Sequence, residues 1–88
     1  MSYCYETERS GLFSDDGQRM FLQVRDRVKW LLEQAGAFRA EKAWKNCTGS
    51  SWQMIACLDR LVELGEIREL TKPGEAWGQH RIFTSMEA

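Results

Sequence analysis

Gln53, Ala56 and Arg60 recur at spacings of three and four residues, which places them on one face of a helix. A glutamine amide pairs with the edge of an adenine, and an arginine guanidinium pairs with guanine or with a phosphate. A small alanine between them lets a helix approach a groove closely. These residue types in this pattern indicate a surface that reads base edges in duplex DNA. Ser51 and Trp52, in the first turn of the same helix, complete the expected DNA-binding surface.

Basic side chains elsewhere are candidates for contacts with the DNA backbone. Such contacts position a protein on a duplex without reading its sequence. Asp59 and Glu63 weaken this hypothesis, because a carboxylate near the phosphates is repelled unless it accepts a hydrogen bond from a cytosine amine. The candidate phosphate-binding residues are Lys42, Lys45, Lys72, His80 and Arg81.

The same region also has purely structural interpretations. Arg60 has two acidic neighbours in the sequence, Glu63 and Glu66, and a charge on an exposed helix face often only pairs locally. Trp52 either covers the first turn of its helix as part of the core or stands out as an interaction residue. Trp77 either closes the open end of a hairpin or inserts at a partner's surface, and the structural role is favoured.

Metal binding and catalysis fit the sequence poorly. Three cysteines and one histidine are by count a zinc set, but zinc sites usually contain a close pair of ligands, and the nearest two here are Cys47 and Cys57. An odd number of cysteines without paired spacing also predicts reduced thiols. Cys57 is expected on the buried side of its helix, and no glycine-rich loop or carboxylate pair marks a catalytic pocket. We therefore expect no metal, no cofactor and no enzymatic activity.

The composition is that of one small folded domain. The chain has 88 residues, of which 43% are apolar and 28% charged, and this length supports a single hydrophobic core. The longest stretch without a charged residue, 46–58, is too short and too polar to span a bilayer. The N-terminus carries acidic residues where a secretory signal would be basic and then apolar. These features predict a cytoplasmic protein without a membrane partner.

Charge is distributed unevenly along the chain. Twelve basic and thirteen acidic residues give a formal charge of −1, so the chain lacks the overall basic field that would by itself indicate nucleic-acid binding. Residues 1–17 carry a local charge of −3, whereas residues 18–88 contain eleven basic and nine acidic residues, or +2. The acidic excess therefore lies in the N-terminal tail.

The first elements follow from the spacing of apolar residues. Residues 1–14 have no apolar period and predict an irregular N-terminal arm. Apolar residues then recur at intervals of three and four, which predicts a helix that begins at Ser14 or Asp15 and is ended by Gly36. A short helix is expected over 39–46.

The later elements include a longer helix and a hairpin. A turn that contains glycine leads into a third helix, which is capped by Ser50 or Ser51 and ended by Gly65. After Gly65 the apolar period changes from about four to two, so 66–71 and 79–84 predict a β-hairpin. The expected core contains Phe21, Val24, Val28, Leu31, Leu58, Leu61 and Phe83, joined by Trp44 and by Ile67 or Ile82.

The order of helix, short helix, glycine turn, longer helix and hairpin resembles the winged helix-turn-helix superfamily over residues 18–85. Residues 57–67, CLDRLVELGEI, look like the end of that family's recognition helix running into the first wing strand. The resemblance implies an α+β fold, with a three-helix winged helix-turn-helix core at 15–85 and a C-terminal two-stranded β-hairpin wing. It also implies a bacterial or phage-type DNA-binding regulator, with the third helix in the major groove and the wing on the adjacent backbone.

Two functions are therefore expected from the sequence. The first is a small DNA-binding protein that regulates transcription and has duplex DNA as its partner. The alternative is a winged-helix protein-protein interaction module without DNA binding. The near-zero net charge, the acidic residues on the third helix and the four tryptophans favour this alternative, since aromatic anchors dominate protein interfaces. The N-terminal arm also offers a means of pairing with a second copy as a homodimer, through Tyr3, Tyr5, Leu12 and Phe13.

Overall fold

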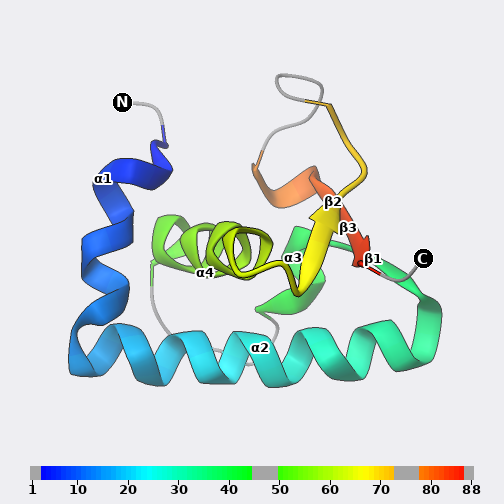
Figure 1. Cartoon of the computed structure of the whole chain (residues 1–88), viewed down its shortest axis with the longest axis horizontal. Coiled ribbons are helices and arrows are strands. Elements are labelled where there is room, and N and C mark those ends of the chain that lie inside the picture. The colour runs from blue at the N-terminus through cyan, green and yellow to red at the C-terminus, as the bar shows by residue number, and fades with distance from the viewer. Residues whose placement is uncertain (1–2, 45–49, 73–77, 87–88) are drawn as a thin grey trace.

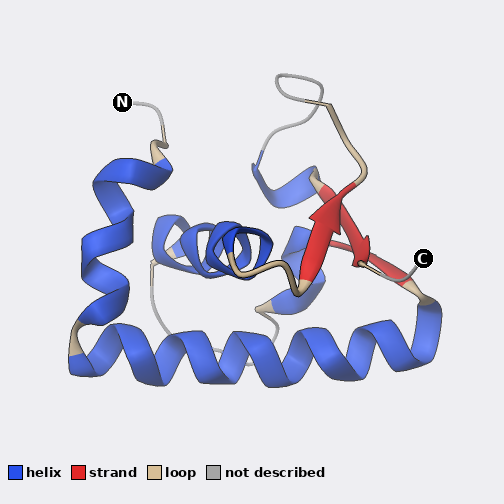
Figure 2. Cartoon of the chain, viewed as in Figure 1, coloured by secondary structure: helices blue, strands red, loops and turns tan. Residues whose placement is uncertain are grey.

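Helix α2 (Asp15–Ala35) runs along one side of the molecule, and the other elements pack against it. Figure 1 shows α4 (Ser51–Glu63) lying over α2, with α1 (Tyr5–Arg9) on one side of α4 and the sheet on the other. Helices and an antiparallel sheet together form an α+β fold (Figure 2). The structure is a computed structural model that describes residues 3–44, 50–72 and 78–86. Within these ranges, no helix combines the length and the apolar character needed to cross a membrane.

The predicted long helix is confirmed, and its ends show why it begins and stops there. The Ser14 hydroxyl oxygen accepts a hydrogen bond from the backbone N–H of Gly17 at 3.0 Å, which satisfies a group that has no partner within the helix. At the other end, Gly36 has a φ of 75°, a left-handed conformation that glycine adopts without steric cost. The Gly36 N–H donates to the Leu32 carbonyl and closes the last turn.

The expectation of an irregular arm over residues 1–14 is wrong for the described part of that segment. Tyr5–Arg9 forms α1 and Ser10–Phe13 forms a 3-10 helix, η1. The Leu12 side chain is only 2% exposed, whereas that of Phe13 is 50% exposed. Each element is about one turn long, so neither is long enough to show an apolar period.

The segment predicted as one short helix divides into two elements. Ala37–Arg39 forms strand β1, and Ala40–Ala43 forms helix α3. The strand is stabilised by packing within the sheet, because the rings of Phe38 and Phe83 stack with their centroids 5.8 Å apart. Residues 45–46 of the predicted helix lie outside the described part of the chain.

The predicted hairpin is confirmed as the antiparallel pair β2 (Ile67–Glu69) and β3 (Ile82–Ser85). The first residues expected in the second strand instead form a 3-10 helix, η2 (Gly78–His80). The expectation of only two strands is wrong, because β1 pairs with the other edge of β3 and aligns Phe38 with Phe83. The strand order β1-β3-β2 places the last strand of the chain at the centre.

Helix α4 also begins and ends as predicted. The Ser50 hydroxyl oxygen accepts from the backbone N–H of Gln53 at 3.1 Å, so Ser50 is the N-cap. Gly65, with a φ of 76°, follows the last turn and leads into β2. The predicted capping residue and the terminating glycine are both confirmed.

One hydrophobic core joins the helices to the sheet, as the sequence predicts. Phe21 and Trp44 pack against this core but stay partly exposed, and Ile82 is partly exposed as well. The predicted core residues that are buried are Val24, Val28, Leu31, Leu58, Leu61, Ile67 and Phe83.

Truncation of Leu58 to alanine tests this core. The Leu58 side chain is 0% exposed, and we expect the variant to lose about 2 to 5 kcal/mol of unfolding free energy, since it leaves a cavity among packed side chains. Urea denaturation measures the loss. Leu64→Ala is the control, because Leu64 is 47% exposed and its truncation is expected to change stability by less than about 0.5 kcal/mol. Similar losses for both variants would contradict the packing.

The contact between η1 and α2 depends on a glycine. A Cβ atom at Gly17 would lie 2.7 Å from the Cα of Leu12, and closer still to the carbonyl oxygen of Gly11. Backbone atoms occupy that space, so no side-chain movement relieves the clash. The burial of Leu12 therefore requires glycine at position 17.

We expect Gly17→Ala to destabilise the protein by about 1 to 3 kcal/mol, the usual cost of overpacking. Gly11→Ala is a matched control, because a Cβ atom at Gly11 meets nothing within 4 Å. Thermal or urea denaturation followed by circular dichroism compares the two variants. Equal stability of Gly17→Ala and the wild type would show that η1 does not pack as described.

Candidate nucleic-acid interface

Helix α4 packs into the core along the side that carries its large apolar residues, and the opposite side is the one that a partner would approach. The core side carries Met54, Leu58 and Leu61, which are all buried. Helical periodicity places four residues on the opposite side. A helix that reads a groove contacts DNA through such an outer side, so the surroundings of this side decide what α4 can bind. The outer residues of α4 are Trp52, Ala56, Asp59 and Glu63.

The first turn of α4 is accessible. Ser51 is exposed, and Trp52 and Gln53 are partly exposed. Three residues of the predicted DNA-binding surface therefore lie together where α4 begins. Trp52 is partly buried, so both of its predicted roles, cover for the helix and contact with a partner, are compatible with its position.

Ala56 is not at the surface, and the prediction that it lets α4 approach a groove is wrong for this structure. Its exposed fraction is 0%. Helix α1 packs against α4, and Tyr3 and Tyr5 pack against the core cluster to which Ala56 belongs. The N-terminal segment therefore lies over the outer side of α4, an arrangement that the sequence of α4 does not reveal.

Arg60 is engaged by its own chain, which confirms the predicted local pairing with Glu63. The Glu63 carboxylate also accepts hydrogen bonds from the Tyr5 hydroxyl at 2.9 Å and from the Arg9 Nε at 3.0 Å. The hydrogen bond from Arg60, followed by those from Arg9 and Tyr5, lowers the pKa of Glu63 to about 2. The Arg60 guanidinium also lies 5.3 Å from the centroid of the Phe13 ring.

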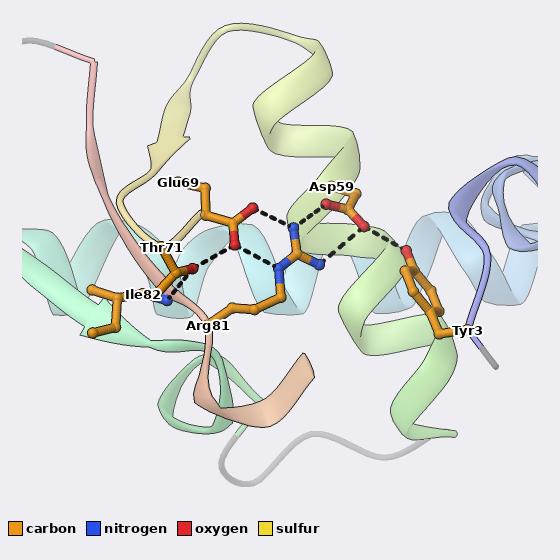
Figure 3. Close-up of polar contacts among 6 residues, drawn as sticks. All are labelled: Tyr3, Asp59, Glu69, Thr71, Arg81 and Ile82. Atoms are coloured by element: carbon orange, nitrogen blue, oxygen red, sulfur yellow. Dashed lines mark hydrogen bonds and ion pairs between the residues drawn. The ribbon is translucent and has the colours of Figure 1, made fainter. Parts of the chain in front are cut away.

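Arg81 is held between two carboxylates and does not present its guanidinium to a phosphate in this structure (Figure 3). Its Nη2 lies 2.7 Å from Asp59 Oδ1 and 2.8 Å from Glu69 Oε1. Only 17% of its side chain is exposed. Burial lowers the pKa of Arg81, but the hydrogen bonds to Glu69 and Asp59 raise it further than burial lowers it, so the net shift is upward. Its role in this structure is to join α4 to β2.

The same cluster includes the N-terminal segment. The Tyr3 hydroxyl donates to Asp59 Oδ2 at 2.6 Å, and burial together with this hydrogen bond raises the pKa of Tyr3. On the other side, the Thr71 hydroxyl donates to Glu69, and the Ile82 N–H donates to the Thr71 hydroxyl at 3.4 Å. Figure 3 shows these side chains meeting from α4, the hairpin and the chain before α1. Sequence reasoning missed this cluster because its members are far apart in the chain.

The remaining predicted phosphate contacts are Lys42, Lys72 and His80, which are all exposed. Lys42 is in α3 and His80 is in η2, and these two elements pack against each other. Two of the predicted basic side chains are thus carried by adjacent elements. Lys45 and Trp77 lie outside the described residues.

The thiols and the acidic side chains form no metal centre in the described ranges. Cys4 is exposed and Cys57 is buried, as predicted for Cys57, and the two form no disulfide with each other. No group of three or more histidine, cysteine, aspartate or glutamate residues in those ranges is arranged to hold a metal ion. Cys47 is outside the described residues. The chemistry of the described site therefore rests on hydrogen bonds and charge.

Known proteins offer no direct guide to this site. Comparisons of the chain with protein-family models, with curated proteins and with solved structures found no match. The function of the site is therefore inferred from its own geometry and charge.

The Glu63 contacts predict a specific dependence of stability on pH. The folded pKa of about 2 lies below the usual value of 4.5, so the stabilising contribution of Glu63 is present above pH 4.5 and is lost as the pH falls toward 2. We expect the melting temperature of the wild type to exceed that of Glu63→Gln at pH 6, and the difference to shrink between pH 4.5 and 2. Circular dichroism measures both profiles.

The matched control is Glu33→Gln, which removes an exposed carboxylate of α2. Its melting temperature is expected to follow that of the wild type across the same pH range. A constant difference between the wild type and Glu63→Gln would contradict the assigned hydrogen bonds.

Proposed function

We propose that the chain is a small DNA-binding protein of winged helix-turn-helix type that regulates transcription in the cytoplasm of a bacterium, as a bacterial or phage-type regulator. The observation that carries the proposal is the accessible first turn of α4, with Ser51 exposed and Gln53 partly exposed. In helix-turn-helix proteins the first residues of the recognition helix contact base edges. Support also comes from the position of α4, which packs on α2 and leads into the antiparallel pair β2–β3.

The charges around α4 are compatible with a DNA phosphate backbone. Asp59 and Glu69 are paired with Arg81, and Glu63 is paired with Arg9 and Arg60. These pairs balance three carboxylates with three guanidinium groups, which removes most of the repulsion that the carboxylates alone would exert on phosphates. Attraction then comes from exposed basic side chains such as Lys42.

A titration with a generic DNA duplex at low salt, followed by fluorescence anisotropy, tests the proposal. Lys42→Ala is expected to weaken binding to all sequences alike and to reduce the slope of log affinity against log salt by about one unit, because one phosphate contact is lost. Lys29→Ala is the matched control: Lys29 is exposed on the side of α2 away from its buried residues, and its loss is expected to leave the slope unchanged.

Gln53→Ala separates base reading from backbone binding. A base-edge contact discriminates between base pairs where a phosphate contact does not. We therefore expect this variant to lose about 1 to 3 kcal/mol of discrimination at one base pair of a selected site. Its affinity for non-specific duplex is expected to stay close to that of the wild type. No measurable affinity of the wild type for duplex DNA at low salt would overturn the proposed function.

A protein-protein interaction module is the second candidate, and the pairing of Arg60 and Arg81 within the chain favours it. Neither guanidinium is presented to a nucleic acid in this structure. Aromatic side chains are available instead: Trp52 is partly exposed, and Trp30 is 48% exposed with the Arg27 guanidinium 4.5 Å from its ring centroid. Such aromatic residues commonly anchor protein interfaces. Failure of the DNA titration would make this candidate the favoured one.

A further inference from the structure

The N-terminal segment lies over the part of α4 that DNA would have to reach. Residues 3–9 contact the outer side of α4 through Asp59 and Glu63, and Figure 1 shows α1 standing beside α4. Ala56, one turn before Arg60 on α4, is fully buried in this arrangement. A recognition helix inserts into the major groove through its outer side, so Ala56 is out of reach of DNA while the segment is in place, whereas the first turn of α4 stays accessible.

Residues 3–9 are held on α4 by polar contacts and by the side chains of Tyr3 and Tyr5, which pack against the core cluster. The Tyr3 hydroxyl donates to Asp59 at 2.6 Å, the Tyr5 hydroxyl donates to Glu63 at 2.9 Å, and the Arg9 Nε donates to Glu63 at 3.0 Å. No residue of α1 is fully buried. Hydrogen bonds at partly exposed positions are weak, because water replaces them when they break. Helix α1 is therefore attached less firmly than the helices that contribute buried residues to the core.

The segment is anchored at its C-terminal end by η1. Leu12 is 2% exposed and belongs to the hydrophobic core, and the Gln18 side-chain amide donates to its carbonyl at 2.9 Å. The close approach of η1 to Gly17 fixes the same point of the chain. Helix α1 can therefore leave α4 while η1 stays in place, with the junction between Arg9 and Ser10 as the hinge.

Departure of α1 leaves the carboxylates of α4 paired. Asp59 keeps its ion pair with Arg81, and Glu63 keeps its ion pair with Arg60. Departure of α1 therefore leaves neither carboxylate without a positively charged partner, which would be the largest energetic cost of the movement. The fold has a charge arrangement that is satisfied with α1 on α4 and with α1 removed.

Charge also opposes DNA binding while the segment is in place. Residues 3–9 contain two acidic residues, Glu6 and Glu8, and one basic residue, Arg9, whereas residues 18–88 carry a net charge of +2. Glu6 and Glu8 belong to α1, which contacts α4 in this structure. Carboxylates repel phosphates, so the segment opposes DNA binding both sterically and electrostatically.

We propose that residues 3–9 form an autoinhibitory cover of α4, and that duplex DNA binds the form in which α1 has moved off α4 about η1. The inference rests on the proposed DNA-binding function. The apparent dissociation constant then equals the intrinsic constant divided by the fraction of molecules in the open form. Any change that weakens the contacts of α1 with α4 is expected to tighten DNA binding without a new contact to DNA.

Arg9→Gln gives a sharp test, because the loss of a positive charge and the loss of a contact that holds the cover predict opposite changes in DNA affinity. Loss of a positive charge by itself weakens binding to DNA, whereas loss of the Arg9 contact with Glu63 opens the cover. We expect Arg9→Gln to bind a generic 20-base-pair duplex about 3- to 10-fold more tightly than the wild type in fluorescence anisotropy. Tyr5→Phe removes one hydrogen bond with no change of charge, and we expect it to tighten binding in the same direction.

Arg19→Gln is the matched control for the charge. Arg19 lies on α2 with 72% of its side chain exposed and contacts only the nearby Asp16 among the described ion pairs. Its loss removes the same charge as Arg9→Gln without touching the cover. We expect Arg19→Gln to bind duplex as the wild type does, or more weakly.

Nuclear magnetic resonance of the wild type follows the movement directly. On addition of the duplex, the amide signals of Tyr5–Arg9 are expected to shift toward random-coil values, while that of Leu12 keeps its folded position. Signals of α1 that stay in place in the DNA complex would overturn the cover, as would Arg9→Gln and Tyr5→Phe variants that bind no more tightly than the wild type. Both results leave the DNA-binding proposal intact, whereas no binding by wild type or variants at low salt overturns both proposals.

Discussion

The guanidinium of Arg81 is the contact on which the arrangement of the sheet and α4 depends. It bridges Asp59 of α4 and Glu69 of β2, and it lies 5.1 Å from the centroid of the Phe83 ring. The Arg81 carbonyl also accepts from the Ala40 N–H at 2.8 Å, which ties α3 to the same point. Loss of either carboxylate would leave this largely buried positive charge without one of its two acceptors, which is strongly destabilising. One residue between η2 and β3 therefore sets how the sheet meets the helices.

Internal pairing of arginines also determines what the surface can offer a partner. Arg9, Arg60 and Arg81 are committed to carboxylates of the same chain, so their planar donor groups are occupied. Lysine side chains such as Lys29 and Lys42 are exposed, and lysine acts as a compact and strongly hydrated charge. Contacts that a partner makes with these lysines are not bidentate and depend on ionic strength.

Sequence reasoning succeeded where an element is long and capped. Helices α2 and α4 have apolar periods and capping serines, and β2 and β3 follow a clear change of period. It failed for β1 and α1, because three to five residues are too few to show a period. Ala56 is fully buried, and Arg81 finds its partners 12 and 22 residues away. Such contacts arise only from the tertiary arrangement.

The strand order has a consequence for how the chain folds during synthesis. β1 and β2 each pair with β3 and not with each other, so neither has a partner in the sheet until β3 has left the ribosome. Helices α2 and α4 need only local hydrogen bonds and form earlier. Phe83, which is 0% exposed, then enters the core last. A chain that stopped short of residue 82 would lack the middle of its sheet and would leave both outer strands open to pairing with other chains.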